Sequence, residues 1–152
     1  MAEKAGRSTD PLAGFQFALD IGGKITGYFS ECSGIGSEHE VIEHKVVDKS
    51  GRELVQKIPG RLKWNDVTLK RGITDSLDIW EWRDLVIDGK MKEARQNCSI
   101  IMFDRNYEPA AQWDFVNAWP LKVTGPDFKA DSNDFGIEEL VLTHEGMKRV
   151  KV

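Results

Sequence analysis

The chain is poor in cysteine, has no excess of basic residues and contains no long apolar run. Among its 152 residues only Cys32 and Cys98 are cysteines, and because they lack the paired spacing of zinc or redox motifs, we expect two buried thiols rather than a disulfide. The formal net charge of −4 disfavours binding of nucleic acid through its phosphates, which needs clustered Lys and Arg. No apolar run approaches the roughly 20 residues that span a bilayer. We therefore expect neither sequence-specific DNA binding nor stable membrane insertion.

Catalytic motifs are missing from the sequence as well. It has no Gly-x-Ser-x-Gly elbow, and no Gly-Lys-Ser or Gly-Lys-Thr follows its glycine clusters, as a phosphate-binding loop requires. His39 and His44 lie five positions apart on an expected strand and face opposite sides, so they cannot hold a metal together. The adjacent Glu138 and Glu139 also point apart, which makes them a poor acid–base pair. We predict no enzymatic activity, no metal site and no cofactor.

The composition is that of one ordinary globular domain. Hydrophobic residues make up 40% and charged residues 30% of the chain, which argues against disorder, and the length suffices for one core but not for two. Residues 1–11 are polar, so we expect a flexible N-terminal arm there and a single domain over residues 12–152. The first ten residues lack the apolar core of a secretory signal, which predicts that the protein is made in the cytoplasm without a signal peptide.

Alternation of apolar and polar residues predicts β-strands in the first third of the chain. Every second residue over 15–21 is apolar, Gly22-Gly23 is typical of a tight turn, and a return strand is expected over about 24–33. Residues 39–47 form a further extended run, but both of its faces mix apolar and polar side chains. Residues 48–63 break the pattern, which predicts a long exposed loop of the kind that is often functional.

A single helix is expected in the middle of the chain. It opens at about Ser76 and ends near Gly89, a residue suited to a helix C-terminus. The N-cap candidates are Thr74, Asp75 and Ser76. Residues 90–96 are expected to be a polar connection. Four residues recur at helical spacing and are predicted to pack on a sheet, namely Ile79, Trp82, Leu85 and Val86.

The second half of the chain is predicted to be β-structure again. Residues 98–103 are apolar on both faces, which favours a central strand, and residues 112–118 alternate. Pro120 predicts a bulge or an edge position before the chain continues, and residues 137–145 form the last expected strand. One helix among seven or eight strands predicts a mainly β (α+β) fold, with two packed antiparallel sheets or a small β-barrel flanked by the helix.

Several motifs follow one another in an order that resembles a known family. They are Val-Ile-Glu-His-Lys at 41–45, Lys-Ile-Pro-Gly-Arg at 57–61, Asp-Val-Thr-Leu-Lys-Arg-Gly at 66–72 and the Trp-rich helix. The longest stretch starts with Asn-Ala-Trp-Pro-Leu-Lys-Val-Thr-Gly-Pro-Asp-Phe at residue 117 and ends with Phe-Gly-Ile-Glu-Glu-Leu-Val-Leu-Thr-His-Glu at residue 145, joined by a polar turn at Asp131, Ser132 and Asn133. The chain resembles the tail tube proteins of contractile phage tails and of phage-derived contractile injection systems over roughly residues 12–150.

This resemblance implies that the protein assembles rather than catalyses. Six subunits would join their sheets edge to edge into a ring, and rings would stack into a hollow tube. A contracting sheath would drive the tube into a target, and the lumen would conduct DNA or effector cargo. The implied partners are further copies of this chain, a sheath protein, baseplate and tube-initiator proteins, and the cargo. The implied location is a phage tail or a phage-tail-like injection particle.

Two sets of residues become candidate contact sites under this interpretation. The candidate lumen-lining residues on strands are Glu40, Ile42, His44, Gln112 and Asp114. The candidate ring-stacking loop comprises Asp48, Lys49, Ser50, Gly51, Arg52, Glu53 and Leu54. An acidic lumen would let DNA or acidic cargo slide without sticking. Two alternatives stay open: a tube-terminator or baseplate-proximal ring protein, and a small ligand-binding β-barrel, which would need a deep pocket with converging polar groups.

Overall fold

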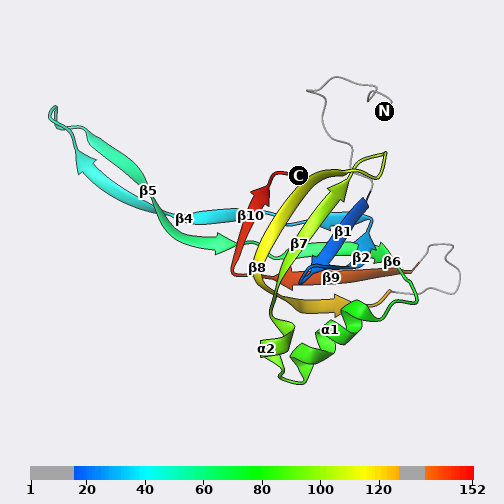
Figure 1. Ribbon diagram of the computed structural model, residues 1–152. Helices are drawn as coiled ribbons and strands as arrows, with labels where there is room; N and C mark the ends of the chain where they lie inside the picture. The colour runs from blue at the N-terminus through cyan, green and yellow to red at the C-terminus, as the bar shows by residue number, and fades with distance from the viewer. Residues whose placement is uncertain (1–15, 127–135) are drawn as a thin grey trace, which may run out of the picture.

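β-Strands dominate the computed structural model, which describes residues 16–126 and 136–152 (Figure 1). The first six strands are β1 (Gln16–Ile21), β2 (Lys24–Phe29), β3 (Glu31–Ser33), β4 (Ser37–Val47), β5 (Glu53–Trp64) and β6 (Val67–Gly72). The helices α1 (Asp78–Ile87) and α2 (Met91–Ala94) follow, and then β7 (Gln96–Phe103), β8 (Pro109–Thr124), β9 (Ile137–Thr143) and β10 (Gly146–Val150). The predicted mainly β fold is confirmed. The expected N-terminal arm and polar turn at 131–133 lie outside the described residues.

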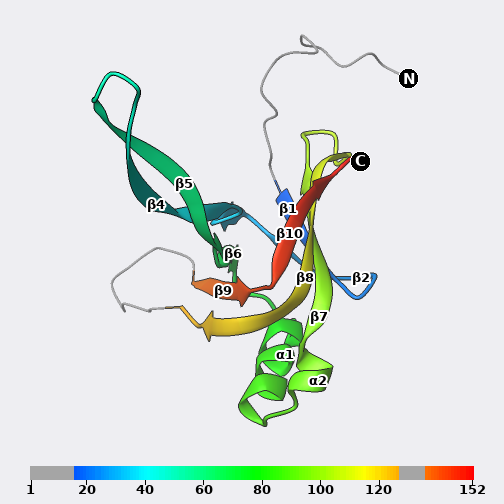
Figure 2. The same ribbon diagram turned by 90° about the vertical axis from the view of Figure 1, so that its left-hand side faces the viewer.

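The strands form a curled body and a projecting arm. The body is an eight-stranded antiparallel sheet with the order β2-β1-β7-β8-β9-β6-β3, in which β10 also pairs with β8. Among the described residues, no strand pairing joins β2 to β3, so the sheet curls without closing into a barrel. Strands β4 and β5 pair with each other to form the arm. The arm projects at one end of the molecule and the two helices lie at the other (Figure 2).

The return strand expected over residues 24–33 changes partner in its middle. β2 pairs with β1, whereas β3 pairs with β6. At the junction, the Ser30 amide donates a hydrogen bond to the Lys70 carbonyl over 2.9 Å. The preceding turn is as predicted, because Gly22 and Gly23 both have positive φ angles of 61° and 93°. The two ends of the body sheet are therefore consecutive in the chain, which gives the sheet its curl.

Strand β8 connects the two halves of the body sheet. Its first half pairs with β7 and β10, and from Trp119 onward it pairs with β9. Asn117, at the change of partner, has a φ angle of 49°. Its amide donates to the Asn97 side chain over 3.1 Å, and its own side chain donates to Glu145 over 2.6 Å. A register shift between Pro120 and Lys122 confirms the bulge predicted at this proline.

The hydrophobic core lies inside the curled sheet and beneath α1. Ile79 and Trp82 of α1 are buried in it, while Leu85 and Val86 are half-buried against it. The strands contribute fully buried residues from every side, among them Leu19, Leu69, Ile100, Phe115, Leu140 and Leu142. All four helix residues that were expected to pack on a sheet thus contact this core. The alternating pattern of β1 and β6 directs their large apolar side chains to one face.

The helical region departs from the sequence-based expectation in two respects. Leu77, not Thr74, Asp75 or Ser76, occupies the N-cap of α1, and its side chain makes no capping hydrogen bond. The Ser76 hydroxyl accepts a hydrogen bond from the Asp78 amide over 3.4 Å. The expected polar connection contains α2, because the Lys90 carbonyl accepts the Ala94 amide over 3.0 Å and Ala94 is fully buried. The Trp82 indole N–H also donates to the Ala94 carbonyl over 2.6 Å, which ties the two helices together.

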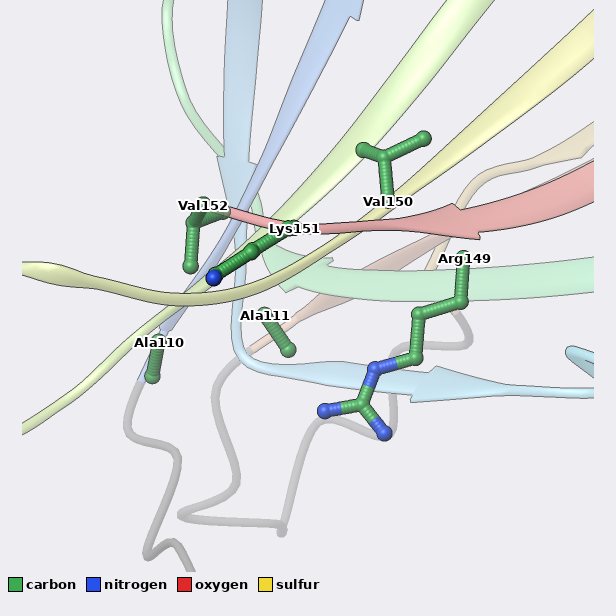
Figure 3. A pocket seen from close by; sticks show the side chains of 6 residues that line it. All are labelled: Ala110, Ala111, Arg149, Val150, Lys151 and Val152. Carbon is green, nitrogen blue, oxygen red and sulfur yellow. The ribbon is translucent and has the colours of Figure 1, made fainter.

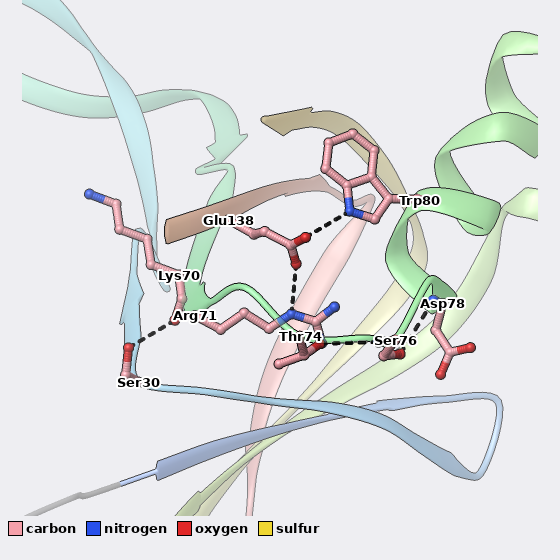
Figure 4. A network of polar contacts seen from close by, with 8 residues as sticks. All are labelled: Ser30, Lys70, Arg71, Thr74, Ser76, Asp78, Trp80 and Glu138. Carbon is pink, nitrogen blue, oxygen red and sulfur yellow. Dashed lines mark hydrogen bonds and ion pairs between the residues drawn. The ribbon is translucent and has the colours of Figure 1, made fainter. Parts of the chain in front are cut away.

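A buried polar cluster connects three elements of the body (Figure 4). Arg71 of β6 forms an ion pair with Glu138 of β9, with 3.1 Å between Nε and Oε2. The Trp80 indole of α1 donates to the other Glu138 oxygen over 3.0 Å. The Arg71 guanidinium also lies over the Phe29 ring, 5.2 Å from its centroid. This cluster fixes α1 against the second half of the body sheet.

Candidate assembly surfaces

The arm replaces most of the loop expected over residues 48–63, so that prediction is wrong. Residues 53–64 form β5, whose pairing with β4 runs from Ser37 opposite Trp64 to Val47 opposite Glu53. Pro59 and Gly60, which resemble a turn in the sequence, lie inside β5 at a register shift opposite β4. A side chain at position 60 would place its Cβ 3.0 Å from the Glu40 carbonyl oxygen, so the close approach of the two strands at this bulge favours glycine.

A tight turn closes the arm at its tip. One carboxylate oxygen of Asp48 accepts hydrogen bonds from the Ser50 hydroxyl (2.7 Å), the Ser50 amide (2.9 Å) and the Arg52 amide (2.9 Å). The bond from the Ser50 hydroxyl, followed by that from the Arg52 amide, lowers the pKa of Asp48. Gly51 has a φ angle of 86°. The candidate ring-stacking residues 48–52 thus form this turn, while Glu53 and Leu54 begin β5.

The two faces of the arm differ in charge. Residues directly opposite each other in an antiparallel pair share a face, and Ile42, His44 and Val46 lie opposite Ile58, Gln56 and Leu54 respectively. We call these six residues the uncharged face. The other side, which we call the charged face, carries the Glu43–Lys57 pair together with Lys45 and Glu53 among its valines.

The uncharged face is exposed apolar surface. Ile42, Leu54 and Ile58 expose 54%, 45% and 44% of their surface. Complete burial of such a side chain contributes roughly 1.5–3 kcal/mol, so covering these three residues would contribute several kilocalories per mole to an association. A two-stranded hairpin is only marginally stable by itself, and contiguous exposed aliphatic surface marks an interaction site. The arm therefore has the properties of a segment that another molecule covers.

His144 anchors the root of the arm to the body. Its Nε2 atom lies 3.0 Å from the Asn65 carbonyl oxygen and its Nδ1 atom 3.2 Å from the Gly146 carbonyl oxygen. The ring packs between Trp64 and Phe115, with centroid separations of 5.9 Å and 4.8 Å. These contacts join the end of β5 to β8 and to the turn before β10, so they set the direction in which the arm leaves the body.

The face of β1, β7, β8 and β10 that points away from the core carries a row of polar residues. Asp20 lies opposite Ser99, Ser99 opposite Asp114, and Asp114 opposite Lys148. The Asp114 carboxylate accepts hydrogen bonds from the Ser99 hydroxyl over 2.7 Å and from the side-chain amide of Gln112 over 2.9 Å. Two carboxylates and one ammonium group therefore line this row, which we call the polar row.

The structure brings only some of the candidate lumen residues together. Gln112 and Asp114 lie on the same face of β8. Glu40, Ile42 and His44 lie on β4, in the separate arm. The sequence cannot reveal this separation, because mixed faces occur both in a strand of the body and in a projecting hairpin. Conversely, Asp20, Ser99 and Lys148 join Gln112 and Asp114 only through strand pairing between distant segments.

The body sheet also presents unpaired strand edges, two of which bound its first half. β2 pairs with β1 along one edge and β10 with β8 along one edge, and within the described residues neither has a partner on the other side. Together with β1, β7 and the first half of β8, they form a five-stranded section bounded by these two edges. Unpaired edges are sites where another chain can add a strand.

No deep pocket with converging reactive groups is found in the described part of the chain. The hollow in Figure 3 is open, has a volume of about 390 Å³ and lies at the end of β10. Its lining residues are Ala110, Ala111, Arg149, Val150, Lys151 and Val152. Residues 16–126 and 136–152 contain no cluster of three metal-ligating side chains, and none of their helices is long and apolar enough to cross a membrane.

The arrangement of body, helices and arm defines the class of protein. It is the fold of phage-tail-like tube subunits, as comparison with solved structures shows. The chain is similar over 95% of its length to 95% of a chain in the sheath–tube complex of an extracellular contractile injection system, PVC, with a TM-score of 0.74 and 21% identity. It is similar over 98% of its length to 97% of a chain in the tube-terminating cap of the anti-feeding prophage, with a TM-score of 0.73 and 20% identity.

The sequence identifies the family itself. The family described as T4-like virus tail tube protein gp19 matches residues 13–148, so this chain belongs to the tail tube protein family. Hcp1 from Flavobacterium johnsoniae shares the fold over 89% of this chain and 94% of its own, with a TM-score of 0.53 and 15% identity. No curated protein is detectably similar in sequence. The protein is a structural component of a phage tail or tail-like particle, and not an enzyme.

Proposed function

We propose that this chain is the repeating subunit of an inner tube, in which hexameric rings stack into a hollow conduit. The observation that carries the proposal is the arm with its exposed uncharged face. A protein that worked as a monomer would leave this surface open to solvent, at the risk of aggregation. In a stacked assembly the arm is the element that reaches beyond its own ring, so the candidate ring-stacking residues 48–54 at its tip are in the right place to contact the next one.

The unpaired edges of β2 and β10 support the closure of each ring. They bound the five-stranded section on opposite sides, so repeated copies can join the β10 edge of one protomer to the β2 edge of the next. Such a heterologous contact closes when the rotation between copies fits a ring. The face that carries the polar row then lines the lumen, with Gln112 and Asp114 as lumen residues. Cargo, whether DNA or an effector protein, would pass along this face.

Similar chains occur in complexes with a sheath, in a baseplate and in a terminating cap, which supports sheath and baseplate proteins as partners. The similarity to a cap chain favours a tube terminator as a second candidate function. A terminator would form rings but would stop growth, whereas a tube subunit would form stacks of rings. The assemblies that the purified protein forms, single rings or stacks of rings, therefore distinguish the two candidates.

Shortening the arm tests the stacking role. Glu43 and Lys57 lie opposite each other, so residues 44–56 can be replaced by Asn-Gly, which closes a hairpin with a two-residue turn. We expect this variant to fold and to form rings at most, while the wild-type chain forms tubes in electron micrographs. Lys45→Ala, which keeps the full arm and changes only the charged face, is the matched control and is expected to form tubes. Normal tubes from the shortened variant would contradict the proposal.

A further inference from the structure

A groove lies between the β1–β2 hairpin and α1, with a volume of about 410 Å³. Its apolar floor consists of Ile21, Trp82 and Leu85. Trp82 is buried, whereas Ile21 and Leu85 are only half-buried, so part of this apolar surface is open to solvent. The groove therefore offers apolar surface that a partner segment can cover.

The rim of the groove is predominantly acidic. Asp78 and Glu81 of α1 lie on one side and Lys24 of β2 on the other. Asp78 and Glu81 are exposed, and within the described residues neither carboxylate has an ion-pair partner. A segment that fits this site would combine an uncharged apolar surface for the floor with cations for the rim.

The tip of the arm has this combination. Val46 and Leu54 form the outermost pair of the uncharged face, and the turn beside them carries Lys49 and Arg52. Of the two acidic residues at the tip, Asp48 already accepts three hydrogen bonds within the turn, and Glu53, at the start of β5, lies on the charged face. The Lys49 and Arg52 side chains are exposed and can pair with the carboxylates of Asp78 and Glu81.

The positions of arm and groove show which molecule provides the tip. The arm points away from α1 and α2 (Figures 1 and 2), so a protomer cannot place its own tip in its own groove. A second copy can do so. A contact between two different surfaces either closes into a ring or repeats along an axis, and we assign ring closure to the β2 and β10 edges, so we assign the arm contact to the stacking direction. The contact thus extends along a stack of rings rather than around one ring.

We propose that the arm tip of one protomer seats in the groove between the β1–β2 hairpin and α1 of a protomer in the next ring. The uncharged face lies against Ile21, Trp82 and Leu85, and the cations of the turn pair with Asp78 and Glu81. This inference rests on the proposed stacking function and identifies the surface that receives the arm.

Cross-linking between two variants tests the contact. Leu54→Cys places a thiol on the uncharged face of the tip, and Thr26→Cys places one in the groove. The native thiols interfere little, because burial raises the pKa of both Cys32 and Cys98 to about 12 and keeps them protonated at pH 8. The two variants are mixed under mild oxidation and digested, and peptides that link positions 54 and 26 are quantified by mass spectrometry.

We expect abundant linked peptide from this mixture. Val47→Cys is the matched control, because residue 47 lies beside residue 46 but on the charged face; with Thr26→Cys it should give at least tenfold less. Equal yields from both pairs, or no link between positions 54 and 26, would overturn the proposed contact. Micrographs of the wild-type protein distinguish the two proposals. If the wild-type protein forms tubes but positions 54 and 26 do not cross-link, only the groove assignment is wrong. If it forms neither rings nor tubes, the proposed function is wrong as well.

Charge exchange across the rim gives an independent test in the same assay. Arg52→Glu and Glu81→Lys should each lower the yield of linked peptide several-fold, because each places like charges together. When Arg52→Glu is introduced into the Leu54→Cys variant and Glu81→Lys into the Thr26→Cys variant, the yield should return toward the original value. If the double exchange does not restore the yield of linked peptide, the result would contradict a direct contact between the turn and the rim.

Discussion

At the scale of single residues, the buried pair of Arg71 and Glu138 has the largest energetic consequence. Both side chains are about 95% shielded from solvent, and the carboxylate accepts from Arg71 and from Trp80. Within the residues that the structure describes, the Nη2 atom of Arg71 is buried without a hydrogen-bond partner, which costs about 1–3 kcal/mol. The pair therefore contributes more to the orientation of α1, β6 and β9 than to net stability. Removing one partner lowers stability, because it leaves the other charge buried and uncompensated.

We predict that Glu138→Ala lowers the free energy of unfolding by about 3–5 kcal/mol, the range for a broken buried ion pair. Tryptophan fluorescence during urea unfolding measures this change. The neighbouring half-buried Glu139 provides the control, and Glu139→Ala should cost less than about 1 kcal/mol. Equal effects of the two substitutions would show that the Arg71–Glu138 pair does not hold the body together.

At the scale of the elements, β8 shows how one strand serves two halves of a sheet. Its backbone turns at Asn117, whose φ angle of 49° is in the left-handed region, where asparagine is more tolerated than most residues. The Asn117 side chain and backbone then bond to Glu145 and Asn97 on the flanking segments. The bend directs the first half of β8 toward the polar row and the second half toward α1.

We expect Asn117→Val to destabilise the protein by about 2 kcal/mol or more, since a β-branched residue at positive φ costs roughly 1–2 kcal/mol and two hydrogen-bonding groups are perturbed. Asn117→Gly keeps the backbone geometry accessible and should cost about half as much. Thermal unfolding followed by circular dichroism compares the two variants. Greater stability of the valine variant would mean that the bend does not depend on residue 117.

At the scale of the whole molecule, the protomer is directional. The arm lies at one end and α1 with its groove at the other (Figure 2), so a stack of protomers has two different ends. In the proposed stack, the exposed arms at one end bind the grooves of incoming protomers, and the exposed grooves at the other end bind the arms of incoming protomers. A protomer without an arm can still be received at one end, but it offers nothing to the next protomer.

The shortened variant, in which Asn-Gly replaces residues 44–56, should therefore act as a chain terminator. When it is mixed with the wild-type chain, the mean tube length in electron micrographs should fall as the fraction of variant rises. The Lys45→Ala protein added in the same proportion should leave the length unchanged. Constant tube length at every proportion of the shortened variant would contradict directional, arm-dependent growth.

Local regularities in the sequence determine much of this fold. Strands such as β1, β6 and β7 are predictable because apolar residues on one face must be buried, and the turn at Gly22-Gly23 because only glycine readily adopts positive φ at successive positions. The packing residues of α1 follow from helical spacing. The family is also predictable from the sequence, because the motifs that surround these elements occur in a characteristic order.

Long-range pairing decided what the sequence did not show. The charged residues among 53–64 all lie at odd positions, but Pro59-Gly60 is typical of a turn, so the sequence is compatible with a loop or a strand, and only pairing with β4 makes these residues an arm. The change of partner at Ser30 and the polar row from Asp20 to Lys148 likewise depend on segments far apart in the chain. The sequence alone thus determined which residues are buried and the family, because burial and turns are local properties. Only the tertiary structure decided which surfaces are left for a partner, because a surface is composed of strands that meet after the chain has folded.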